Sequence, residues 1–295
     1  MDTTSSPLLP PELERIVFET AARMAFGSIP PLMLVARRVH IWLEPLLYRV
    51  IRQKHVPAAV IIAVLESRPE ILRNAVESLF FNSNLEDELS TERSDQLLAT
   101  CSTSISNLFF DRFPKDKAVW TMLPGLPKLS RLTCPLLILT GIVSLDPSTM
   151  QYRYPLLTHA EVGGTVAAEF FVLAGSISTL THLACTNPSD SFEASIRRFL
   201  ESTPRIVAVI IVCGSSFVGQ YFDAVNDVAL AECDQARLMG GTYPDGADED
   251  SWMEWQDSAL GIGMDFWDRG ELFLERKRKG EVDASRRWMD DFVYE

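Results

Sequence analysis

The sequence lacks the short motifs that mark phosphate, dinucleotide and metal sites. No Lys-Ser or Lys-Thr follows the glycines of residues 214–219, and Gly261-Ile262-Gly263 has no third glycine at the dinucleotide spacing. There is no Cys-x-x-Cys or His-Glu-x-x-His pattern that would bind zinc. None of the four histidines adjoins a serine or cysteine suited to nucleophilic catalysis. These absences predict a protein that is not an enzyme and has no cofactor, no metal site and no catalytic residues.

The sequence also has little positive charge, few cysteines and no long hydrophobic run. The 295 residues carry a net charge of −13, which disfavours nucleic acid as a partner because phosphates are repelled. The longest apolar runs, residues 56–65 and 206–213, fall short of the about 20 residues that a membrane helix needs. The polar, acidic opening residues predict no secretory signal. Five widely spaced cysteines are typical of reduced thiols, so we expect a cytoplasmic or nuclear protein without membrane contact.

Apolar residues at helical spacing dominate residues 7–52. Leu13, Ile16 and the apolar residues that follow recur at intervals of three and four, which predicts a helix that ends at a Gly-Ser pair. A proline pair at residues 30–31 opens a second helix, and Pro45 is expected to break or kink it. The expected product is a unit of three short helices around a small core, too small to be stable without a partner or a following domain.

Three strings in this segment follow a known pattern. A Leu-Pro pair precedes an acidic residue and an apolar helix, Leu-Val-Ala-Arg-Arg-Val occupies residues 34–39, and Trp-x-Glu-Pro-Leu-Leu-Tyr occupies residues 42–48. The segment resembles an F-box, and more closely the F-box-like segment that opens many fungal proteins of the mushroom type. The resemblance implies an adaptor that binds the Skp-type protein of a cullin-type ubiquitin ligase. It assigns this contact to Leu9, Pro10, Leu13, Ile16, Phe18, Leu34, Val35 and Trp42.

Near copies of short apolar strings recur through residues 53–243. Leu-Phe-Phe begins at positions 79 and 108, and Leu-Thr-His begins at positions 157 and 180. Matching apolar positions form the series 79, 108, 132, 160, 183 and 209, with steps of 23 to 29 residues. This period is typical of leucine-rich repeats, in which each unit adds one strand and one helix to a solenoid with a parallel sheet. We predict six or seven degenerate repeats of this kind; an unrelated α/β domain with similar buried strands is the alternative.

The same series predicts a docking surface on the sheet. Side chains alternate along a strand, so the residues that flank the buried positions point to the inner, concave face. Aromatic and arginine side chains are enriched at interface anchors, which favours recognition of an unknown protein target on that face. Burial of Phe80 and Phe109 under a neighbouring loop is an equally open alternative. The predicted target-binding residues are Phe80, Phe109, Asp111, Arg131, His159, Glu161 and His182.

Residues 244–295 combine acidity with aromatic side chains. They carry fifteen acidic and seven basic groups, and residues 240–250 are predicted to form an acidic loop. The aromatic residues favour a cap over the last repeat, because a terminal repeat must cover its apolar face; an exposed peptide-binding surface is the alternative. The basic run at residues 276–279 is interpreted as a solvated helix end rather than a nuclear-localisation patch.

Together these features predict an α/β protein of three parts. A three-helix F-box-like head (residues 7–52) precedes a degenerate leucine-rich-like strand/helix solenoid (residues 53–243) and an acidic, aromatic C-terminal cap or tail (residues 244–295). The predicted function is substrate recognition within a cullin-type ubiquitin ligase. Two rival hypotheses stay open: a repeat scaffold for protein partners without any ubiquitin link, and an enzyme with an unrecognised site.

Overall fold

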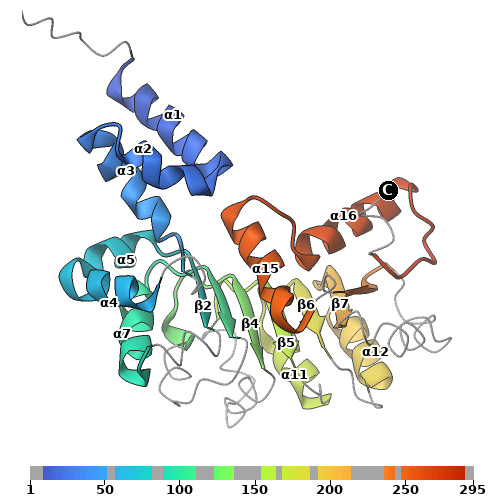
Figure 1. Ribbon diagram of the computed structural model, residues 1–295. Helices are drawn as coiled ribbons and strands as arrows, with labels where there is room; N and C mark the ends of the chain where they lie inside the picture. The colour runs from blue at the N-terminus through green and yellow to red at the C-terminus, as the bar shows by residue number, and fades with distance from the viewer. Residues whose placement is uncertain are drawn as a thin grey trace, which may run out of the picture.

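The computed structural model describes residues 9–51, 57–81, 89–110, 123–135, 154–163, 168–186, 192–213, 236–242 and 247–289. Within them the chain forms an eight-stranded, fully parallel sheet whose strands lie side by side in sequence order (Figure 1). The strands are β1 (Val50–Ile51), β2 (Ser78–Phe81), β3 (Asn107–Phe110), β4 (Arg131–Pro135), β5 (His159–Gly163), β6 (His182–Cys185), β7 (Ala208–Cys213) and β8 (Leu238–Thr242). The predicted α/β class with one strand per repeat is confirmed.

The strand register matches the apolar series read from the sequence. Residues 79, 108, 132, 160, 183 and 209 occupy equivalent positions in neighbouring strands. Ile51 extends the series at one end and Leu238 at the other. The predicted six or seven repeats are therefore too few, because the described residues hold eight strands. The first strand was missed because it has only two residues, directly after the helical segment.

One face of the sheet carries the helices of the repeats (Figure 1). Ile61 and Val64 of the first repeat helix, and Ile196 and Phe199 of the last, are buried in the core that this face shares with the helices. The sequence spacing of these residues places them on one side of each helix. The helices are α4 (Ala58–Ser67), α5 (Pro69–Ala75), α7 (Thr91–Cys101), α11 (Ala168–Ser176) and α12 (Phe192–Ser202), with a short 3₁₀ turn η2 (Leu123–Gly125).

The N-terminal helices stand at the first edge of the sheet (Figure 1). They are α1 (Pro11–Met24), a 3₁₀ turn η1 (Phe26–Ser28), α2 (Ile29–Met33) and α3 (Arg37–Leu47), together called the head below. Ala22, Ile29, Val39 and Leu43 form the small buried core of the head. Of the break or kink expected at Pro45, the break is wrong, because α3 continues through this residue to Leu47. Pro45 lies in the last turn, where its missing N–H removes a single helical hydrogen bond.

Two C-terminal helices lie across the face of the sheet opposite the repeat helices (Figure 1). They are α15 (Ala247–Leu260) and α16 (Phe266–Lys279), and residues 247–289 are called the arm below. Asp265 and Asp268 form a reciprocal capping box that starts α16. Gly280 ends α16 with a left-handed φ of 73°, and the basic residues 276–279 form its last turn, where they complement the helix dipole.

The predicted acidic loop at residues 240–250 is wrong at both ends. Gly240 and Gly241 belong to β8, and Ala247 already begins α15. Both glycines pair with β7 on one side. On the other side, the backbone of residues 287–289 bonds both N–H and C=O of Gly240. This contact covers the open edge of β8. No helix in the described part of the chain is long and apolar enough to cross a membrane.

Candidate functional site

The sheet face opposite the repeat helices, called the inner face below, carries most of the residues predicted to bind a target. Strand alternation directs the apolar series into the core, so the neighbouring positions of each strand point to the inner face. Their side chains form clusters separate from the repeat core. The inner-face residues include Val50, Phe80, Phe109, Arg131, Thr133, His159, Glu161, His182, Ala184, Ala208, Ile210 and Met239. Asp111 lies outside the described residues.

The inner face is covered by the arm rather than open. Phe80 is 1% exposed and Phe109 is 6% exposed, although both point away from the repeat core. Their rings stack at 4.4 Å between centroids, and Trp255 of α15 lies over both at 5.7 and 5.6 Å. The Trp255 indole N–H donates to Asn107 Oδ1 at 2.9 Å, so its polar atom is also satisfied. The expectation of an exposed concave docking surface is corrected here: the aromatic face requires burial, and α15 supplies it.

Polar contacts attach the arm to the middle strands. Arg131 on β4 bonds the buried carboxylate of Asp265, the N-cap residue of α16, at 3.2 Å. Beside them Thr133 donates to Glu161 at 2.8 Å, and Glu161 is only 3% exposed. Each buried charge or acceptor in this row therefore has a bonded partner, as a buried ionic group requires. Arg131 and Glu161, predicted to contact a target, are engaged inside the molecule.

At the far end of the sheet α16 lies directly on β7 and β8. A Cβ atom at Gly270 would meet Ile210 Cδ1 at 2.8 Å, so any larger residue requires the Ile210 side chain or the helix to shift. Arg269 donates to the Thr242 carbonyl oxygen at 2.7 Å and pairs with Glu254 of α15. At the opposite end Arg49, next to β1, donates to the Leu260 carbonyl oxygen at 3.0 Å. The arm therefore spans the sheet from β1 to β8, and the predicted cap over the last repeat alone is wrong in its extent.

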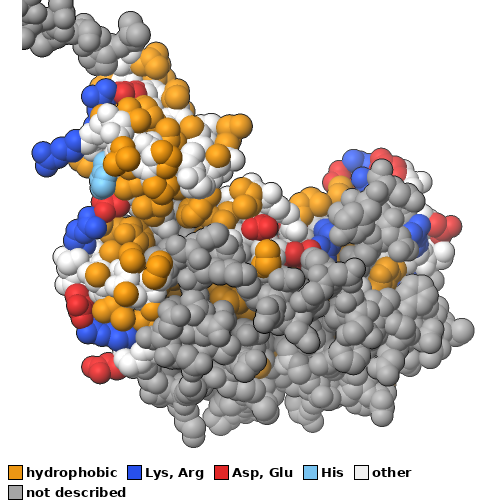
Figure 2. Space-filling model, viewed as in Figure 1, with side chains coloured by type: hydrophobic (Ala, Val, Ile, Leu, Met, Phe, Trp, Pro, Cys, Tyr) orange, Lys and Arg blue, Asp and Glu red, His pale blue; other side chains and the backbone are white. Residues whose placement is uncertain are grey.

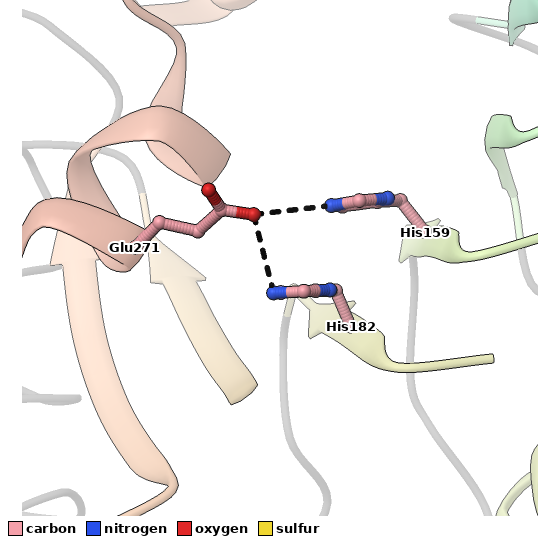
Figure 3. Close-up of side chains that lie close together, drawn as sticks. All are labelled: His159, His182 and Glu271. Atoms are coloured by element: carbon pink, nitrogen blue, oxygen red, sulfur yellow. Dashed lines mark ion pairs between the residues drawn. The ribbon is translucent and has the colours of Figure 1, made fainter. Parts of the chain in front are cut away.

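Two histidines and one glutamate meet beneath α16 (Figure 3). The imidazoles of His159 on β5 and His182 on β6 stack at 4.2 Å with an interplanar angle of 6°. Glu271 Oε1 lies 3.8 Å from His159 Nε2 and 3.4 Å from His182 Nε2. Trp267, one turn before Glu271, presents its ring nearly perpendicular to both imidazoles, at 5.1 and 6.1 Å. The cluster joins two strands and the arm at a single point.

Burial keeps both imidazoles neutral. Desolvation lowers the pKa of His159 to about 3, with further lowering by the charges of His182 and Arg131. Desolvation, followed by the charge of Arg131, lowers the pKa of His182 to about 4. At neutral pH each ring therefore has one nitrogen with a free lone pair and one N–H group.

The head differs from the inner face because its apolar residues are exposed (Figure 2). Among the residues assigned to an adaptor contact, Pro10 is exposed, while Phe18 and Trp42 are half-buried against the small head core. The others are Leu9 at 46%, Leu13 at 50%, Ile16 at 58%, Leu34 at 85% and Val35 at 62% exposure. The residues taken from the F-box-like strings therefore lie mostly on the solvent side of the head.

The arm residues that complete the site were not predicted. Trp255, Trp267 and Glu271 lie 85 or more residues beyond the aromatic and histidine side chains they contact, so no local pattern connects them. The available signal was the density of tryptophan and phenylalanine in residues 244–295, because aromatic residues in a polar tail need an apolar surface to bury.

The sequence matches no protein-family model and no curated protein. Among solved structures, a similar one is the leucine-rich repeat-containing protein LegL7 from Legionella pneumophila. It has 14% sequence identity and a TM-score of 0.39, over 72% of this chain and 68% of that chain.

Proposed function

We propose that the chain is a non-enzymatic interaction scaffold of the cytoplasm or nucleus. In this proposal the head binds a Skp-type adaptor of a cullin-type ubiquitin ligase, and the repeats present a protein target for ubiquitin transfer. The observation that carries the proposal is the exposed apolar surface of the head. Eight large apolar residues of the head are more than 45% exposed: Leu9, Leu13, Ile16, Val17, Met24, Leu34, Val35 and Ile41.

The cost of exposing these side chains supports a partner. Burial of apolar surface stabilises by about 25 cal/mol for each Å², so a partner that covers several large side chains gains considerable free energy. Clustered exposed apolar residues mark interaction surfaces in proteins that are otherwise well packed. The rest of the described chain buries its large apolar residues more completely, with isolated exceptions such as Val172 on α11.

The choice of a Skp-type partner depends on the F-box-like strings. Five of the eight exposed residues, Leu9, Leu13, Ile16, Leu34 and Val35, belong to these strings. Phe18 and Trp42 instead support the fold of the head from beneath. The interface energy is therefore expected to come mainly from α1 and from the turn between α2 and α3.

The arm covers the inner face of the repeats, so it affects how a target could bind there. Phe80, Phe109, His159 and His182 contact the tryptophans of α15 and α16, so a target could reach them only after the arm moves away. We therefore propose that a target either displaces the arm from the inner face or binds the outer surface of the arm. Hydrogen exchange around Trp255 separates these two routes. Exchange becomes faster on target binding if the arm is displaced, and slower if the target binds the outer surface of the arm.

Co-purification with a Skp-type adaptor tests the head. Leu13→Ser combined with Leu34→Ser removes two exposed side chains and leaves the buried head core intact, so the variant is expected to fold and to lose adaptor binding. Val172→Ser on α11 is the matched control, since Val172 is 64% exposed but lies outside the head. Adaptor binding that survives the double substitution, or that is lost equally in the control, contradicts the proposal.

A repeat scaffold without a ubiquitin link is the second candidate. It is favoured by the parallel strand and helix architecture, which forms an extended surface irrespective of the head. Affinity purification with mass spectrometry from the native cell separates the two candidates. The scaffold alone is supported if the wild type recovers no Skp-type or cullin protein and the Leu13→Ser/Leu34→Ser variant still recovers the other partners.

A further inference from the structure

The two histidines beneath α16 hold buried polar atoms that no group in the described part of the chain satisfies with a hydrogen bond. The Nε2 atoms of His159 and His182 are inaccessible to solvent and have no hydrogen-bond partner in the described part of the chain. Buried polar atoms are normally paired, so each unpaired atom indicates an absent ligand or an unusual strain. Both atoms point toward the same carboxylate oxygen of Glu271 (Figure 3).

A threonine hydroxyl contacts the Nδ1 atom of each ring. Thr158 Oγ1 lies 2.8 Å from His159 Nδ1 and donates its own proton to the Ser130 carbonyl oxygen. Thr181 Oγ1 lies 2.8 Å from His182 Nδ1 and donates to the Thr158 carbonyl oxygen. When the hydroxyl proton is donated to the carbonyl oxygen, each Oγ1 accepts from Nδ1–H, and the Nε2 lone pair is then free. An N–H bond from the second ring nitrogen to a fixed acceptor is what orients histidines that ligate metals.

With the lone pairs on Nε2, a cation between the three groups would balance the charge of Glu271. Two Nε2 lone pairs face a carboxylate oxygen at 3.8 and 3.4 Å, which is repulsive when nothing lies between them. Protonation of the rings is opposed by their burial, which holds both pKa values far below neutral. Arg131 does not supply the missing charge, because its guanidinium is paired with Asp265.

We propose that His159 Nε2, His182 Nε2 and a Glu271 carboxylate oxygen bind a divalent transition metal of the zinc type. The three candidate ligand atoms lie within 4.8 Å of one another. Tetrahedral zinc with bonds of about 2.0–2.1 Å separates its ligand atoms by about 3.3 Å, so a small contraction closes the site. The parallel rings turn about their side-chain bonds so that their lone pairs converge. The half-exposed Glu271 side chain moves with them, and a water molecule is the fourth ligand of the metal.

The donor set selects the class of metal. Imidazole nitrogens suit zinc, copper, nickel and iron, whereas magnesium and calcium prefer oxygen ligands throughout. Such an ion would connect β5 and β6 to α16. It would hold the arm on the inner face and thereby control access to the surface that the repeats would otherwise present.

Zinc binding to the full chain tests this assignment. The purified protein is stripped with a chelator, dialysed, and titrated with ZnCl₂ by isothermal titration calorimetry at pH 7.5 under reducing conditions. We expect one zinc per chain, and an affinity about 100-fold lower for His182→Ala and Glu271→Gln. His40→Ala is the matched control: its side chain is exposed and forms a similar contact with Glu44, so its loss leaves zinc affinity unchanged.

Two further readouts keep the proposal falsifiable. Glu271 is 55% exposed, so Glu271→Gln is expected to fold, and its circular dichroism spectrum checks this. Titration with CoCl₂ reports the ligands, because nitrogen and oxygen ligands give only weak visible bands whereas thiolates give strong near-ultraviolet charge transfer. Zinc should also slow hydrogen exchange in α16. No zinc binding by folded wild type, unchanged affinity in Glu271→Gln, or a thiolate spectrum would overturn the assignment.

Discussion

The head and the arm are both helical segments attached to one parallel sheet, yet they treat their apolar residues in opposite ways. The arm turns Trp255, Phe266, Trp267 and Phe273 toward the sheet, and each is at most 4% exposed. The head leaves Leu34 at 85% and Met24 at 79% exposure. The arm therefore buries its apolar residues against the sheet of the same molecule, whereas the head leaves several of its apolar residues exposed.

This difference shows that an apolar helix by itself does not reveal a binding surface. The arm covers the inner face because Phe80 and Phe109 on the sheet offer an aromatic surface to Trp255. The head rests on a small core of its own, and within the described residues one side of α1 is left exposed. The predictions below compare the two regions, beginning with the largest expected effect on stability.

Trp255→Ala is expected to lower the free energy of unfolding by about 3–5 kcal/mol. The substitution opens a cavity over Phe80 and Phe109 and leaves Asn107 without its donor. Urea unfolding followed by circular dichroism measures the loss. Trp255→Phe keeps most of the ring and should lose less; a loss below about 1 kcal/mol for the alanine variant would show that the arm is not packed on the sheet.

Gly270→Leu is expected to destabilise the arm by about 1–3 kcal/mol. A side chain here must displace Ile210 Cδ1, which lies 2.8 Å from the Cβ position. Hydrogen exchange should accelerate in α16 more than in the repeat helices. Glu275→Leu, on the exposed side of the same helix, is the control, and equal acceleration in both variants would contradict the close contact.

Acidification of the metal-free protein should weaken the arm but not the head. The folded pKa values of His159 and His182 are lowered to about 3 and about 4, whereas the unfolded value is 6.5. The unfolded state therefore binds more protons, and the stability present above pH 6.5 is lost as the pH falls toward 4. Between pH 6.5 and 5.5 the loss is about 1 kcal/mol for each histidine.

Urea unfolding in the presence of a chelator measures this dependence on pH. The double variant His159→Asn/His182→Asn should show a flatter stability profile between pH 6.5 and 5.5. An unchanged slope in that variant would assign the pH dependence to other groups.

Leu34→Ser is expected to change the free energy of unfolding by less than about 0.5 kcal/mol. Its side chain is 85% exposed and makes little contact within the chain, so the substitution removes no packing. Thermal unfolding measures the effect. A large loss would mean that this side of the head is buried in the folded protein, and the contrast between head and arm would disappear.

The repeat architecture could be predicted from the sequence because the buried strands require apolar residues at regular intervals. Each repeat needs an apolar residue at the same strand position, and the steps of 23 to 29 residues located these positions before the strands were seen. Errors arose where local rules compete. Pro45 was expected to break or kink a helix, but it lies in the last turn of α3, where its missing N–H removes a single hydrogen bond. Gly240 and Gly241 were expected to open a loop, but they pair with β7 in the sheet.

Sequence alone also determined which residues share the inner face, since side chains alternate along every strand. It did not determine what covers that face. His159 and His182 are 23 residues apart and become neighbours through strand pairing, whereas Glu271 reaches them from 89 residues further along the chain. Periodicity is a local property, while the docking of α16 depends on the complementarity of two surfaces distant in sequence. Only the tertiary structure could therefore decide that the aromatic face is closed and that two histidines and a glutamate meet beneath the arm.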